Sequence, residues 1–144
     1  MPDLGETMRG YAEKAVAEAR GRFGIALDFS PASVLRVEEM AAAIQTRRQR
    51  RMHADEHGDP SPDWDPSEAA EYPELALVLG AYLGEVIRRR FGGAWENPGQ
   101  GARLQVGSED LNPCGLAYFR ITQGHDNLRD YFERVAKKLE GQNA

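Results

Sequence analysis

The chain has little cysteine and no long apolar run, and each shortage excludes a class of protein. Its single cysteine, Cys114, cannot form an internal disulfide and suits a reducing compartment. The longest apolar run, LALVLGAYLG, has ten residues, whereas a helix that spans a bilayer needs about 20. The opening MPDLGE is acidic and lacks the apolar core of a secretory signal. We therefore expect a cytoplasmic protein with no membrane partner.

The chain also has fewer basic residues than acidic ones, 18 against 23. The formal net charge is −5 at pH 7, which argues against nucleic acid as the partner, because phosphate binding depends on an excess of Lys and Arg. From His53 to Glu74 there are eight carboxylates and no Lys or Arg. Two arginine clusters, Arg47–Arg51 and Arg88–Arg90, flank this acidic segment. Neither cluster has the interleaved aromatics or the motif of a nucleic-acid site, and the acidic segment can answer their charge.

The pattern of apolar residues predicts a single α+β domain over residues 1–144, with no internal repeat and no need of a disulfide or structural metal. The expected order is two N-terminal helices, a central helix, a small antiparallel sheet and a C-terminal helix. We predict helices at 3–21, from Ser30 to the first arginine cluster, at 73–91 and at 126–139, with an acidic, proline-rich loop at 53–67. Two short extended pieces flank the turn in AWENPGQGARLQV, and LAYFRI, residues 116–121, reads as the best strand.

Two glycines, Gly80 and Gly84, interrupt the apolar central helix. Glycine within a helix costs up to about 1 kcal/mol relative to alanine, so a pair of them needs a reason. Residues four apart lie on one face, and we predict a groove there that receives Trp95. Glu85, with Arg89 four residues later, has three interpretations: an exposed ion pair, a buried carboxylate that accepts hydrogen bonds from the strand or loop, or a general base.

The acidic loop carries several residues with potential chemistry. His53 and His57 are four apart, but Ala54 stands where a zinc protease needs glutamate. Its aspartates, among them Asp63 and Asp65, do not follow the spacing of an EF-hand. A solvated acidic loop, with no bound metal, is therefore the favoured interpretation. Trp64 either folds back on the domain or contacts a partner.

Cys114 lies in NPCGL, and the one histidine in the C-terminal half is His125. A nucleophilic cysteine needs a base and a lowered pKa. A Cys–His pair stays open from sequence, since the two residues lie at opposite ends of the predicted strand. A structural cysteine near a turn is the favoured interpretation.

Two stretches resemble an uncharacterised family of small bacterial domains. GAYLGEVIRRRFGGAW is similar to a helix reading Gly-x-Tyr-x-Gly-Glu that leads through Gly-Gly to a Trp-bearing strand. NPCGLAYFRITQGHDNLRDYF is similar to a second block, where Asn-Pro opens a strand and Gly-x-Asp starts the final helix. The resemblance covers about Leu75 to Leu139 and implies an α+β fold but no activity. It implies a signature cluster of Tyr82, Gly84, Glu85, Gly93 and Trp95.

These observations favour a non-catalytic protein-interaction module, one version of which is an immunity-type protein that masks a basic toxin surface. The predicted binding residues are Trp64, Asp63, Asp65, Glu85, Tyr82 and Trp95. No cofactor or metal is expected, and a homo-oligomer stays open. The alternative is a small hydrolase that uses Glu85 with His125, or an enzyme with a metal in the His53–Asp65 loop.

Overall fold

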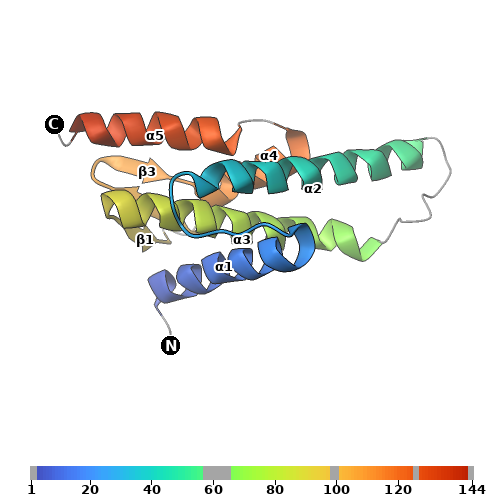
Figure 1. The fold of residues 1–144 in the computed structure, drawn as a ribbon, viewed down its shortest axis with the longest axis horizontal. Coiled ribbons are helices and arrows are strands. Elements are labelled where there is room, and N and C mark those ends of the chain that lie inside the picture. Colours follow the sequence, from blue (N-terminus) through green and yellow to red (C-terminus); the bar gives the residue numbers. More distant parts are fainter. Residues whose placement is uncertain (1–2, 57–65, 98–100, 125–126, 143–144) are drawn as a thin grey trace.

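Five α-helices and a three-stranded antiparallel sheet make up the part of the chain that a computed structural model describes (Figure 1). That part comprises residues 3–56, 66–97, 101–124 and 127–142. The helices are α1 (Leu4–Glu18), α2 (Ser33–Glu56), α3 (Pro66–Phe91), α4 (Pro113–Gln123) and α5 (Leu128–Gln142), and a π-helical turn, η1 (Ala19–Phe23), extends α1. The strands are β1 (Ala94–Glu96), β2 (Arg103–Val106) and β3 (Glu109–Leu111). The α+β class and the expected arrangement of helices and sheet are confirmed.

Local features at the helix ends fix where the first two helical segments begin and end, and α2 begins at Ser33, three residues after the predicted start. The Asp3 carboxylate accepts a hydrogen bond of 2.7 Å from the Glu6 amide and caps α1. The Ser30 hydroxyl accepts one of 3.2 Å from the amide of Ser33, where α2 begins. Gly24 ends the first helical segment with φ of +65°, a left-handed conformation that glycine adopts without strain.

Helix α3 is the centre of the fold. It packs most extensively against α4 and α1, while α2 and α5 complete the bundle (Figure 1). Every residue from Val78 to Ile87 is buried, so this stretch is apolar on nearly all faces, as expected for a helix surrounded by other elements. All the buried apolar residues belong to one core cluster.

The sheet presents one buried face to the helices. The strand order is β1-β2-β3, and the pairing sets Trp95 opposite Leu104 and Leu104 opposite Leu111. These three residues are buried, and because side chains alternate along a strand they lie on the same face. The register therefore fixes the Trp95 side chain over the central helix.

The prediction of a strand at 116–121 is wrong, because these residues belong to α4. The Asn112 side chain caps the helix by accepting a hydrogen bond of 3.1 Å from the Gly115 amide, and Pro113 occupies its first turn. Tyr118 and Phe119, which are neighbours, are both exposed, whereas a half-buried strand would bury one of them. The Asn-Pro step that the family resemblance places before a strand thus starts a helix.

The predicted boundaries of the acidic loop are also wrong. Helix α2 continues through the first arginine cluster and His53 to Glu56, and α3 begins at Pro66, seven residues before the expected start. Pro73 therefore lies inside α3. Regular helix covers both ends of the predicted loop 53–67, and residues 57–65 lie outside the described ranges.

Candidate functional site

The predicted groove at Gly84 exists and is filled by Trp95. A Cβ atom added at Gly84 would overlap the six-membered ring of the Trp95 indole and would lie 3.2 Å from Pro113. The glycine therefore permits a close approach that alanine would block. The packing interpretation of this residue is confirmed.

Glu85 is fully buried and its carboxylate is satisfied by two partners. Arg88 donates to it through Nε at 2.5 Å and through Nη2 at 3.2 Å, and the Trp95 indole N–H donates at 3.3 Å. The expected pair with Arg89 is wrong, because the partner is three residues away and not four. Glu85 thus joins α3 to β1, which matches the second of the three interpretations.

Arg89 and Tyr82 instead contact the segment between η1 and α2. The Arg89 guanidinium lies 3.7 Å from the centroid of the Phe29 ring, and that ring packs against Tyr82 at 4.7 Å between centroids. The buried Tyr82 hydroxyl accepts a 2.7 Å hydrogen bond from the Phe29 amide and lies 2.7 Å from the Ser33 hydroxyl. Phe29 has φ of +62°, a strained value for a bulky residue. Tyr82 therefore fixes the path of the chain into α2.

The other helix glycine, Gly80, receives the first turn of α4. A Cβ atom added there would overlap the backbone and Sγ of Cys114. The Cys114 thiol points at the Leu77 carbonyl at 3.7 Å, and burial raises its pKa to about 12. A thiol with this pKa stays protonated at neutral pH, so it lacks the thiolate of a nucleophilic cysteine. His125 lies outside the described residues.

A buried ion pair that sequence reasoning missed joins α2, α4 and α5. Arg120 donates to the Glu38 carboxylate through Nε at 2.8 Å and Nη2 at 2.7 Å, and it also contacts the Gln45 side chain. Glu38 accepts a further hydrogen bond of 2.9 Å from the Leu128 amide, at the start of α5. A signal was available, because Glu38 falls within the buried stripe of α2 between Val37 and Ala41.

The middle of the acidic segment, residues 57–65, lies outside the described part of the chain. His57, Asp63, Trp64 and Asp65 lie in the gap between α2 and α3, and His53 lies in the last turns of α2. Among the described residues, no three His, Cys, Asp or Glu side chains gather closely enough to hold a metal ion.

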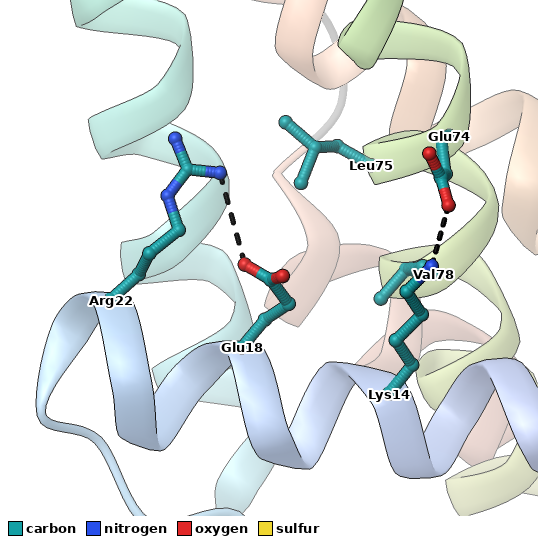
Figure 2. A pocket seen from close by; sticks show the side chains of 6 residues that line it. All are labelled: Lys14, Glu18, Arg22, Glu74, Leu75 and Val78. Atoms are coloured by element: carbon teal, nitrogen blue, oxygen red, sulfur yellow. Dashed lines mark hydrogen bonds and ion pairs between the residues drawn. The ribbon is translucent and has the colours of Figure 1, made fainter.

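A groove between α1 and α3 is a further candidate site (Figure 2). Its volume is about 120 Å³, and it is lined by Lys14, Glu18, Arg22, Glu74, Leu75 and Val78. Lys14 and Glu74 form an ion pair of 2.6 Å, which raises the pKa of the lysine. Glu18 has one carboxylate oxygen, Oε2, that is buried and accepts no hydrogen bond from the described residues. We call this site the α1–α3 groove.

An apolar cavity of about 150 Å³ adjoins the α1–α3 groove and shares Arg22 and Leu75 with it. Most of its lining is apolar, from Phe23, Ala43, Ile44, Tyr72 and Leu75, and Arg47 lines it as well. The π-helical turn η1 supplies both Arg22 and Phe23, and such turns occur frequently at functional sites. The sequence carries one sign of the groove, because Lys14, Glu18 and Arg22 alternate in charge at a spacing of four.

No protein-family model, curated protein or solved structure matches the chain. In the residues that the structure describes, no helix is long and apolar enough to span a membrane. The case for a function therefore depends on the chemistry of the chain itself.

Proposed function

We propose that the protein is a non-catalytic interaction module that binds a basic protein partner through its acidic segment, His53–Glu74. The observation that carries the proposal is the charge of this segment, which has eight carboxylates and no Lys or Arg. An immunity-type role, in which the segment masks a basic toxin surface, is the concrete version. A cytoplasmic location is part of the same proposal and is based on the single cysteine.

The position of the acidic segment in the fold supports this proposal. The end of α2 and the start of α3 extend past α1 and α4 at one end of the molecule (Figure 1). Carboxylates at a protruding end can approach a basic surface before the rest of the molecule touches it. Complementary charge of this kind raises the association rate and selects against acidic partners.

The state of the two strongest catalytic candidates also supports a binding role. The Glu85 carboxylate has no solvent exposure, and it accepts hydrogen bonds from Arg88 and Trp95. The Cys114 pKa of about 12 keeps that thiol neutral. Both side chains have structural partners that explain their burial.

Native mass spectrometry of the chain, recovered at low salt from its own host, tests the proposal. We expect a stoichiometric complex with a basic protein. A variant carrying Asp63→Asn, Trp64→Ala and Asp65→Asn should lose most of that complex, because it removes two charges and the aromatic contact.

A matched control removes two charges elsewhere. Glu13→Gln with Glu39→Gln alters two exposed carboxylates on α1 and α2 and should leave the complex intact. Equal complex formation by both variants would place the contact outside the acidic segment. A complex with an acidic protein, or a chain that carries only a small molecule, would contradict the proposal.

A further inference from the structure

We propose that the α1–α3 groove and the adjoining apolar cavity together bind a free apolar amino acid, such as leucine, as its zwitterion. The charged groove would hold the α-ammonium and α-carboxylate groups, and the apolar cavity would hold the side chain. This site shares Tyr72 and Glu74 with the end of the acidic segment, but its existence does not depend on a protein partner.

The charges that line the groove match a zwitterion. Two carboxylates, Glu18 and Glu74, alternate with two cations, Lys14 and Arg22, over a floor of apolar side chains. A lone anion or a lone cation would disturb this balance, whereas a ligand with one charge of each sign preserves it. Figure 2 shows these four side chains extending from α1, η1 and α3 toward the same space.

Glu18 carries the unsatisfied acceptor of the groove, although its side chain as a whole is 34% exposed. Its Oε2 atom is buried and receives no hydrogen bond within the described part of the chain, although Arg22 Nη1 forms an ion pair with it at 3.8 Å. That distance is too long for a hydrogen bond, and a buried acceptor without a donor is costly. An ammonium group placed beside Glu18 would donate the missing hydrogen bond.

Arg22 can donate hydrogen bonds to the carboxylate of the ligand. Within the described residues its guanidinium makes the long ion pair with Glu18 and a contact of 6.0 Å with the Phe23 ring. Its N–H groups therefore have room to donate to a carboxylate, which arginine binds in a fork-like geometry. Lys14, in contrast, is already paired with Glu74 at 2.6 Å.

The volumes of the two cavities indicate a small ligand. Cavities of about 120 and 150 Å³ are smaller than the roughly 300–1,000 Å³ pockets of drug-sized ligands. Arg22 and Leu75 lie in the walls of both cavities, so the two cavities are neighbours and one small ligand can contact both. An aliphatic or single-ring side chain suits apolar walls formed by Phe23, Ile44 and Tyr72.

A titration of the ¹⁵N-labelled full chain with L-leucine, followed by ¹H–¹⁵N NMR, tests the site. We expect saturable shifts in the amides of Glu18, Arg22 and Leu75, with a Kd on the order of 1 mM for a ligand this small. N-acetylleucine lacks the ammonium, and leucinamide lacks the carboxylate. Each should bind at least about tenfold more weakly, because it loses one charge-assisted contact.

Variants locate the contacts. Glu18→Gln should weaken leucine binding about tenfold or more, since it removes the anionic acceptor, while leaving the weak binding of N-acetylleucine unchanged. Glu13→Gln, on the exposed side of the same helix, should have no effect. An unchanged amide spectrum away from the groove serves to show that each variant is folded.

Three outcomes would overturn the proposal. The first is no saturable shift with leucine or phenylalanine up to about 10 mM, ten times the expected Kd. The second is equal binding of leucinamide and leucine, which would assign the site to the N-terminal residue of a polypeptide. The third is equal binding of N-acetylleucine and leucine, which would assign it to a C-terminal residue.

Discussion

Two glutamates, Glu85 and Glu38, are buried in the interior, and both are stabilised in the same way. A buried carboxylate is tolerated only when its charge is paired and its oxygens accept hydrogen bonds. Each of these residues pairs with an arginine and accepts one further N–H, from the Trp95 indole or from the Leu128 amide. Glu38 connects helices that are distant in sequence, whereas Glu85 joins α3 to the strand that directly follows it.

The Glu38 site gives the clearest prediction for a single residue. Glu38→Ala should destabilise the protein by about 3–5 kcal/mol, because it leaves a buried guanidinium without its partner. The Arg120 side chain is only 11% exposed, so water offers little compensation. Urea unfolding measures the change.

The neighbouring residue provides a matched control. Glu39 is exposed on the same turn of α2, and Glu39→Ala should change stability by no more than about 0.5 kcal/mol. Similar losses for the two variants would mean that the Glu38–Arg120 pair does not hold the three helices together.

Cys114 gives a prediction about pH. Burial raises its pKa from 9.0 to about 12, so the unfolded chain loses the thiol proton at lower pH than the folded protein. Folding is therefore unaffected by this group below about pH 9 and is increasingly disfavoured as pH rises from 9 toward 12. Between pH 7 and about 10.5, the wild type should lose about 2 kcal/mol more stability than Cys114→Ala. Urea unfolding at the two pH values measures this, and parallel losses would contradict the assignment.

At the scale of whole elements, α3 depends on its two glycines to receive other elements. Gly80 accommodates the start of α4, and Gly84 accommodates the Trp95 ring of β1. Neither approach is compatible with a Cβ atom unless backbone or a packed ring moves. The glycines therefore lower the helix propensity of α3, but they allow close packing on two of its sides.

Substitution of Gly84 tests this packing. Gly84→Leu should unfold or loosen the domain, with a loss of about 3 kcal/mol or more, because overpacking alone costs 1–3 kcal/mol and the Glu85–Trp95 hydrogen bond would also be displaced. Gly10→Ala is the control, since a Cβ atom there contacts nothing within 4 Å; it should stabilise α1 by up to about 1 kcal/mol. Thermal unfolding distinguishes the two, and a fully stable Gly84→Leu protein would refute the packing role.

The sequence predicted elements best where local signals and tertiary packing agree. Asp3, Gly24 and the Gly84–Trp95 contact could all be inferred, because a cap, a turn and a groove each leave a local mark. Residues 116–121 misled the prediction, since their aromatic and branched side chains resemble a strand. The helix signals lay just outside that run, at Asn112 and Gly124, whose left-handed conformation ends α4.

The candidate sites were less accessible from sequence, because they depend on pairs distant along the chain. The partner of Glu38 is 82 residues away at Arg120, and the α1–α3 groove brings Glu18 beside Leu75. No local sequence pattern identifies a partner that is so many residues away. A spacing can show that a charge lies on the buried face of a helix, but only the fold supplies its partner.

At the scale of the whole molecule, negative charge is concentrated in sequence between two arginine clusters. Three arginines of these clusters have roles in the fold: Arg48 donates to the Thr122 carbonyl at 2.8 Å, Arg88 binds Glu85, and Arg89 covers Phe29. The carboxylates of the acidic segment are therefore not needed to neutralise these three arginines. This distribution is the reason to propose that the acidic segment faces a partner.

The salt dependence of association tests that proposal most directly. With the basic partner recovered by native mass spectrometry, the association rate constant would be measured by stopped flow at about 20 mM and 500 mM NaCl. The Debye length falls from roughly 20 Å to about 4 Å over this range. We expect the rate constant to fall at least about tenfold, and to fall much less for the Asp63→Asn/Asp65→Asn variant. A rate constant that does not change with salt, or that changes equally in both proteins, would contradict binding through the acidic segment.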